Sequence, residues 1–157
     1  MHSMKQNFFA TWRHLALGVG MLLASFGAQA QACNISASAP MLFGTYNPLS
    51  FSDQLAQTSV SARCIGFGNI RVLLGAGLAG TVNDRRMQRN GVDLPYGLYI
   101  NPARTTLWGN GTGGTSVVTR FVFLFSEFTL PIYGRIPARQ NIPVGFYTDS
   151  VTVQFEF

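Results

Sequence analysis

A strict alternation of apolar and polar residues at the C-terminus constrains the fold of this 157-residue chain more than any other feature. The apolar positions are Val151, Val153, Phe155 and Phe157, and the residues between them are polar. Such a period of two places the apolar side chains on one face, which predicts a half-buried β-strand within residues 147–157. Chain ends are usually frayed and polar. The pattern therefore suggests that something outside the domain holds this end.

Strand signals also dominate the rest of the chain after residue 32, and no helical period is sustained. The predicted strands lie near residues 33–39, 58–64, 69–74, 96–100, 117–125 and 129–136. Asn90-Gly91 predicts a two-residue hairpin, because a type I′ turn requires positive φ at both positions. The aromatic run 117–125 is either a strand buried on both faces or an edge prone to aggregation. Strands separated by Gly, Pro and Asn favour an all-β sandwich.

The first thirty residues have the pattern of a signal peptide. A basic start containing Lys5 and Arg13 precedes an apolar stretch that is too short for a membrane span. Ala28-Gln29-Ala30 is the expected cleavage site, with a second possible cut after residue 32. We therefore expect an exported protein with no membrane span in its mature chain and with one domain, residues 31–157.

The only two cysteines, Cys33 and Cys64, remain after such processing. In an oxidising exported compartment, an even pair predicts a disulfide, and closing this loop would stabilise the fold by roughly 3–4 kcal/mol. The alternatives are two buried free thiols or lipidation of Cys33, for which the preceding residues fit poorly.

Composition argues against an enzyme. Beyond residue 30 the chain has nine arginines and six acidic residues without a dense basic run, so no nucleic-acid partner is expected. Both histidines lie within the first thirty residues, which removes the usual general base and most zinc sites from the mature chain. Asp84 and Asp93 could in principle form a carboxylate pair, but they are better interpreted as solvated charges beside a hairpin. We expect no catalytic residue, cofactor or metal.

Two local motifs require interpretation. Gly75-Ala-Gly77-Leu-Ala-Gly80 matches the dinucleotide-binding fingerprint, which functions only where a helix begins. A hairpin follows instead, so we expect a flexible turn that leaves a strand.

Arg85, Arg86 and Arg89 form a basic group that is either a solvated hairpin rim, which we favour, or a contact for an acidic surface or glycan.

An ordered set of short motifs resembles the spore coat protein U family, whose members are subunits of archaic chaperone–usher pili. The matching pieces are Cys33-Asn-Ile-Ser, Phe43-Gly-Thr-Tyr-Asn-Pro-Leu-Ser50, Cys64, Arg86-Met87, Leu94-Pro-Tyr-Gly-Leu-Tyr99, Leu107-Trp-Gly-Asn-Gly111, Tyr133-Gly-Arg-Ile136 and Gly145-Phe-Tyr-Thr-Asp-Ser-Val-Thr-Val. The resemblance implies an immunoglobulin-like β-sandwich that lacks its last strand.

The resemblance also implies the partners: a periplasmic chaperone, an outer-membrane usher and neighbouring pilin subunits of a cell-surface fimbrium. Donor-strand complementation of pilins is an example of strand addition to a sheet edge. Val151, Val153, Phe155 and Phe157 would then lie beside the incoming strand, with the terminal carboxylate near the basic cleft of the chaperone. Family members that polymerise carry a donor segment before the first cysteine, and here almost nothing would precede Cys33. We therefore expect a minor or tip subunit.

The main alternative is a self-sufficient exported binding module. It would contact a glycan or a surface through residues 108–114, which begin with Trp108, or through the 85–89 hairpin. Trp108 is equally suited to a packed core. An exported hydrolase is a third possibility that the missing histidine disfavours.

Overall fold

The computed structural model describes residues 31–157, and the predicted signal peptide, residues 1–30, lies outside the described residues. The described part contains seven strands: β1 (Ala32–Ser38), β2 (Gln54–Leu74), β3 (Ala79–Thr81), β4 (Asp84–Arg89), β5 (Val92–Tyr99), β6 (Val118–Ile136) and β7 (Val153–Glu156). It contains no helix, and hence no helix that could cross a membrane. The predicted all-β fold is confirmed.

All seven strands belong to one antiparallel arrangement in the order β1-β2-β6-β5-β4-β3, with β7 paired to β2. The long strands β2 and β6 form its centre and pair from Gln54–Ile136 to Val72–Val118. On its other edge, β2 pairs with β1 up to Ile65 and then, from Arg71 onward, with β7. One strand thereby supports elements from both ends of the described chain.

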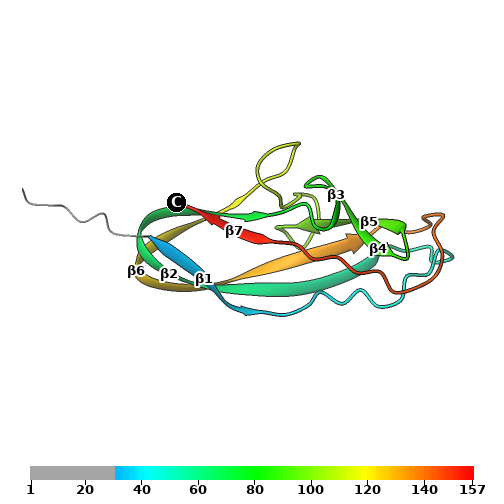
Figure 1. The fold of residues 1–157 in the computed structure, drawn as a ribbon, viewed down its shortest axis with the longest axis horizontal. Helices are drawn as coiled ribbons and strands as arrows, with labels where there is room; N and C mark the ends of the chain where they lie inside the picture. Colours follow the sequence, from blue (N-terminus) through cyan, green and yellow to red (C-terminus); the bar gives the residue numbers. More distant parts are fainter. Residues whose placement is uncertain (1–30) are drawn as a thin grey trace, which may run out of the picture.

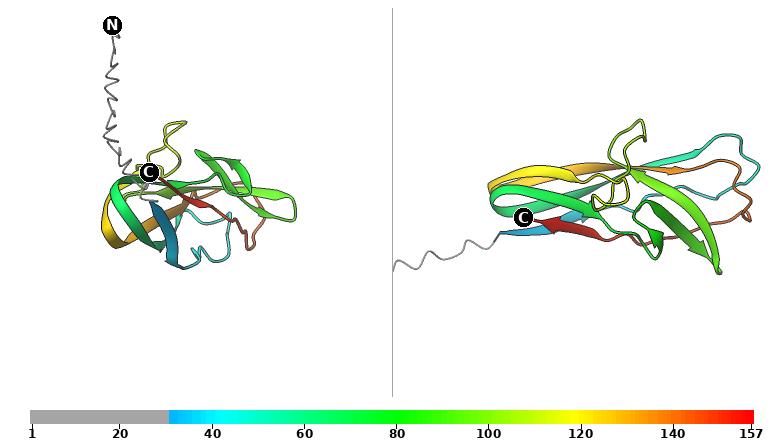
Figure 2. Two further views of the ribbon diagram at one scale, coloured as in Figure 1. Left: turned by 60° about the vertical axis from the view of Figure 1, so that its left-hand side comes forward. Right: turned by 90° about the horizontal axis from the view of Figure 1, so that it is seen from above.

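β2 and β6 curl together at one end of the molecule, where the described chain also begins and ends (Figures 1 and 2). We name residues 65–69 and 121–125 the bend. Gly66 and Gly68 adopt φ values of 145° and 135° there, and Leu124, opposite Gly66, has a φ of 52°. The prediction of separate strands before and after these glycines is therefore wrong. Glycine permits the curvature while the hydrogen-bonded ladder continues.

The curl folds the sheet over a core whose buried strand residues come from β2, β4, β5 and β6, with Cys33 of β1 and with Val153 and Phe155 of β7 packed against it. Its fully buried side chains include Ile70, Val72, Leu74, Leu94, Trp108, Val122, Leu130 and Ile136. The Trp108 indole N–H donates to the Val72 carbonyl oxygen at 2.9 Å. Trp108 is therefore a core residue and offers no surface to the binding-module alternative.

The hairpin prediction is confirmed, whereas the aromatic run differs from expectation. Asn90 and Gly91 have φ values of 50° and 78° between β4 and β5, as a type I′ turn requires. In the aromatic run, Val118 and Val122 are buried, but the side chains around the bend are exposed. The prediction of a strand buried on both faces is thus wrong, because the curl turns one face of β6 outward.

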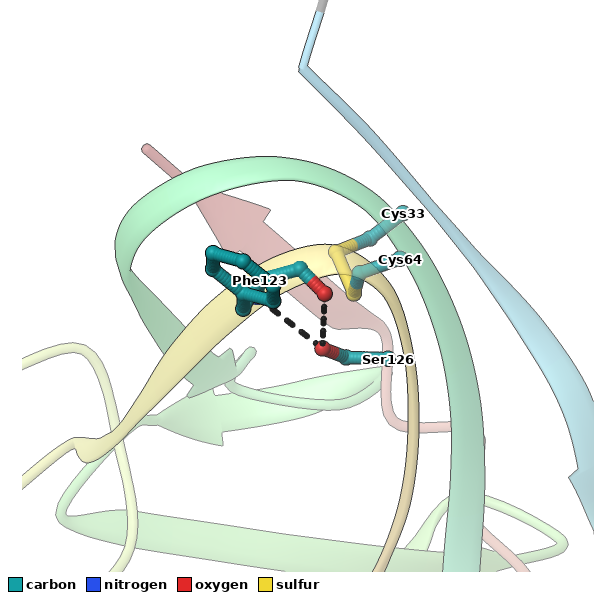
Figure 3. The surroundings of a disulfide bond; sticks show 4 residues. All are labelled: Cys33, Cys64, Phe123 and Ser126. Atoms are coloured by element: carbon teal, nitrogen blue, oxygen red, sulfur yellow. Dashed lines mark hydrogen bonds between the residues drawn. A yellow bond between two sulfur atoms is a disulfide. The ribbon is translucent and has the colours of Figure 1, made fainter.

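A disulfide joins β1 to β2 beside the bend (Figure 3). Cys33 and Cys64 are direct partners in the β1–β2 register, with Cα atoms 4.1 Å apart. The predicted disulfide is confirmed, and Cys33 has no free thiol to be acylated. The covalent link fixes the start of β1 to the curled end of the sheet.

Candidate functional site

An open groove of about 750 Å³ runs between two segments that are far apart in sequence. Residues 38–44, which continue β1, form the first wall, and residues 146–151, which lead into β7, form the second wall. The two segments meet where Tyr46 and Gly145 exchange backbone hydrogen bonds of 2.8 and 3.1 Å. Between the walls themselves, the described part of the chain shows no backbone hydrogen bond. The result is a slot between two wall segments that follow β1 and precede β7, with no described residue forming a strand between them.

The floor of the groove is made of core side chains from the central strands. They are Val60 from β2, Met87 from β4, Tyr96 and Leu98 from β5, and Ile132 from β6. Each of these residues is at most 8% exposed, and all belong to one apolar cluster. The floor is therefore continuous with the core of the sandwich. Apolar side chains placed over it would extend that core.

Side chains hold the first wall in place. The Thr58 hydroxyl donates to the Ala39 carbonyl oxygen at 2.7 Å, and the Gln54 amide donates to the Phe43 carbonyl oxygen at 3.0 Å. Met41 and Phe43 pack against the core. Ile35, on the same face of β1 as Cys33, remains 45% exposed. An inward-facing residue of an edge strand stays exposed when no element covers it from the opposite side.

The second wall is supported by backbone hydrogen bonds near its centre and just beyond its end. Thr148 exchanges bonds of 2.8 and 3.1 Å with Gln88 of β4, and the Thr152 carbonyl oxygen accepts the Gly75 N–H at 2.9 Å. Between these points, the Asp149 carboxylate anchors the wall through its side chain. The wall is thus attached to the domain on one side only, and its other edge faces the groove.

The four apolar residues predicted from the C-terminal alternation lie at different places along this element. Val151 lines the groove. Val153 and Phe155 belong to β7 and pack against the core, where β7 pairs with β2. Phe157 follows β7 and is 50% exposed. The structure therefore brings Val151 to the groove lining and places the other three beyond it, toward the bend.

Sequence reasoning missed the first wall and the floor. The floor residues come from four strands, and only long-range pairing brings them together. The first wall did carry a signal, because the apolar run Met41-Leu-Phe43 lies between Pro40 and Gly44, close after the alternating pattern of residues 33–39. Leu42 in that run is 79% exposed, which is unusual for an apolar residue next to a core.

A buried polar network lies behind the second wall. The Tyr96 hydroxyl donates to the Asp149 carboxylate at 2.5 Å. Burial, together with this hydrogen bond and the negative charge of Asp149, raises the pKa of Tyr96 well above its usual value. Arg85 is 1% exposed, and burial lowers the pKa of its guanidinium, an effect that the nearby Tyr96 and Asp149 oppose.

The interpretation of Arg85 as part of a solvated hairpin rim is wrong. Its side chain points into the domain, because alternate residues of β4 face opposite sides of the sheet. Arg86 pairs with Asp84 at 2.7 Å, and Arg89 donates to the Val144 carbonyl oxygen at 2.6 Å. The three arginines thus have separate structural roles and form no common patch. Within residues 31–157, no cluster of three potential metal ligands occurs.

Comparison with known proteins identifies the family. The model of the Spore Coat Protein U domain matches residues 20–154. The chain belongs to the spore coat protein U domain family. One curated relative, Protein U of Myxococcus xanthus, is 34% identical over 143 residues, which cover 80% of this chain and 78% of the relative. The motifs that suggested the resemblance extend over the same region.

A solved structure supports the same classification. It is the crystal structure of the CsuC–CsuE chaperone–tip adhesion subunit pre-assembly complex from archaic chaperone–usher Csu pili of Acinetobacter baumannii. The matched chain is 25% identical, and the superposition has a TM-score of 0.58 over 82% of this chain. This chain spans only 40% of that chain. The predicted immunoglobulin-like sandwich is confirmed.

Proposed function

We propose that this protein is a structural subunit of an archaic chaperone–usher pilus and that its groove accepts a β-strand from a partner. The observation that carries the proposal is the slot itself, which has two facing wall segments, an apolar floor and no strand between the walls in the described part of the chain. A strand inserted there could form a hydrogen-bonded ladder with each wall and place alternate side chains on the floor.

The dimensions and energetics suit a strand. A seven-residue wall corresponds to about 23 Å of extended chain, which presents three or four side chains to one face. Burying three or four apolar side chains would contribute on the order of 10 kcal/mol before ordering costs. That gross contribution is comparable to the whole stability of a small domain. Folding and strand acceptance would therefore be coupled.

Two occupants follow one another in this proposal. A periplasmic chaperone first supplies the strand, with the C-terminal carboxylate of Phe157 held in its basic cleft. At the outer-membrane usher, an extended segment of a neighbouring subunit then replaces the chaperone strand. The route ends at a cell-surface fimbrium, and it requires no cofactor or catalytic residue from this chain.

We further propose a minor or tip position. Cleavage after residue 30 or 32 would leave almost no segment before the disulfide-bonded Cys33. The Gln31 side chain supports this view, because its amide donates to the Phe67 carbonyl oxygen at 2.6 Å and it packs against Gly66. With cleavage after residue 30, these contacts keep Gln31 on its own domain and oppose its use in a donor strand. N-terminal sequencing of the exported protein, combined with immunogold labelling of fibres, tests this point, and labels spaced along the shaft would contradict it.

Co-expression with the periplasmic chaperone tests the main proposal. The expected product is a one-to-one complex in which amide hydrogen exchange is slow at both walls, whereas the 109–114 loop exchanges quickly in the same sample. Production without the chaperone should give aggregated or degraded protein. A stable monomer that folds without a chaperone and has rapidly exchanging walls would contradict strand acceptance.

A further inference from the structure

The glycine-rich turn that resembles a nucleotide fingerprint holds a carboxylate of the protein itself. The Leu78 backbone N–H donates to Asp149 Oδ1 at 2.6 Å. Gly77 has a φ of 86°, and a Cβ atom at this position would lie 2.1 Å from Asp149 Oδ2. The turn therefore closes around the Asp149 carboxylate, and a side chain at Gly77 would displace it. Backbone N–H groups in such turns favour anions, which is why the motif resembles a phosphate site.

The same carboxylate reaches the floor of the groove. Asp149 Oδ2 accepts the hydroxyl of Tyr96, a floor residue of β5, at 2.5 Å. Asp149 Oδ1 also accepts the N–H of its neighbour Ser150 at 2.7 Å. One side chain of the second wall thus joins that wall to the glycine turn and to the sheet beneath it.

Buried Arg85 fixes the turn from below. Its Nε donates to the Gly75 carbonyl oxygen at 2.8 Å, and its Nη2 donates to the Leu74 carbonyl oxygen at 3.1 Å. The remaining nitrogen, Nη1, has no hydrogen-bond partner among the described residues. The cost of burying a cation is offset when an anion lies nearby, and Asp149 supplies that charge.

We infer that Asp149 is a positioning residue of the groove: it holds the second wall at the place where the wall can form a ladder with an incoming strand. This inference rests on the proposed strand-accepting function. Between the Thr148–Gln88 pair and the Gly75–Thr152 bond, the backbone of the second wall makes no other hydrogen bond to backbone in the described chain. The side chain of Asp149 supplies the attachment that a neighbouring strand would otherwise provide.

The test measures how firmly subunit variants hold the periplasmic chaperone. Each complex is mixed with an excess of fluorescently labelled chaperone, and the rate of exchange is recorded together with amide hydrogen exchange. Asp149→Ala should exchange chaperone at least about tenfold faster than wild type, because the lost contacts are charge-assisted hydrogen bonds. Asp149→Asn keeps an oxygen for the Leu78 N–H and should restore part of the slow exchange. Asp84→Ala, which removes a half-exposed carboxylate paired with Arg86, is the control.

A second pair of variants leaves Asp149 in place. Gly77→Ala and Gly91→Ala both put a side chain at positive φ, but only Gly77→Ala displaces the Asp149 carboxylate, since nothing lies within 4 Å of a Cβ at Gly91. Gly77→Ala should therefore reproduce the fast chaperone exchange and Gly91→Ala should not. This comparison remains decisive if Asp149→Ala fails to fold.

Hydrogen exchange separates positioning from general stability. In the Asp149→Ala and Gly77→Ala complexes, the amides of residues 146–151 should exchange faster, whereas those of the buried part of β2 should be unchanged. Uniformly faster exchange throughout the domain, or chaperone exchange at the wild-type rate, would overturn the inference while leaving the proposed function intact. A wild-type subunit that forms no chaperone complex would overturn both.

Discussion

The groove and the bend both leave large apolar side chains in solvent, but they differ in what could cover them. The groove has two facing backbone edges above a buried floor, so a strand would gain a ladder on both sides. At the bend, the exposed side chains include Phe67, Phe123 and Phe125, and only one long edge of β6 is free. Apolar exposure alone therefore does not identify a strand acceptor. The arrangement of free backbone edges does.

The free edge of β6 at the bend is also partly blocked. Leu124 has a φ of 52°, which interrupts the regular geometry of the strand. The Ser126 hydroxyl accepts the Phe123 N–H at 3.0 Å and donates to the Phe123 carbonyl oxygen at 3.3 Å (Figure 3). Backbone groups that are satisfied locally are not available to another chain, and native sheets protect their edges by such irregularities. The first wall of the groove contains Pro40, which has no N–H to donate, whereas the second wall contains no proline.

The largest difference between the two regions should follow from introducing a charge. Val151→Asp removes a partly buried valine and places a carboxylate in the groove lining. This change should weaken chaperone binding by about 4 kcal/mol, or about a thousandfold. Phe125→Asp alters a residue that is 82% exposed at the bend and should change the affinity less than about threefold. Quantitative pull-down with titrated chaperone measures both. Equal losses in the two variants would contradict the distinction between groove and bend.

Removing the disulfide should have the next largest effect, because it connects the two regions. Cys33–Cys64 fixes β1 at the bend, and β1 continues into the first wall of the groove. The double substitution Cys33→Ser and Cys64→Ser should lower the free energy of unfolding of the chaperone complex by about 3–4 kcal/mol. Chemical denaturation with and without reductant measures this change. The wild-type complex under reducing conditions should match the double variant, and an unchanged midpoint would show that β1 is held by other contacts.

The sequence predicted those features that depend on local pattern. The Asn90-Gly91 turn needs only two residues with positive φ, and the terminal alternation persists in the burial of Val151, Val153 and Phe155. The groove depends on contacts between distant segments, so only Val151 of its lining is among the four residues that the terminal alternation singled out. Glycines 66 and 68 were misinterpreted as breaks because the same residue that ends a strand also permits a bend. Arg85 was misplaced because a charged residue in a polar hairpin is normally solvated.

An alkaline pH should destabilise the groove side of the domain specifically. Burial raises the pKa of Tyr96, and the hydrogen bond to Asp149 raises it further. Above pH 10, Tyr96 therefore stays neutral in the folded state, whereas the same tyrosine ionises in the unfolded state. The folded state then binds more protons than the unfolded state. The free energy of unfolding must therefore fall as pH rises above about 10, by at most about 1.4 kcal/mol per pH unit from this residue.

Thermal melting of the chaperone complex between pH 9 and pH 11 measures this dependence. Tyr96→Phe should give a shallower decrease than wild type, because it removes the group whose ionisation differs between the two states. Tyr133→Phe removes a tyrosine that lies away from Asp149 and serves as the matched control. A wild-type decrease that Tyr96→Phe leaves unchanged would assign the alkaline effect to other residues.

The smallest effect is expected at the bend itself and concerns association. Ser126→Ala removes both hydrogen bonds to the Phe123 backbone and should cost less than about 1 kcal/mol of stability, because water can replace them at an exposed site. It also leaves backbone groups of an aromatic edge strand available to other molecules, so the chaperone complex should self-associate more strongly in sedimentation velocity experiments. Ser61→Ala, which loses only a side-chain bond to Thr129, is the control. If Ser126→Ala remains as monodisperse as wild type, the curvature of the bend protects this edge, and the local hydrogen bonds of Ser126 do not.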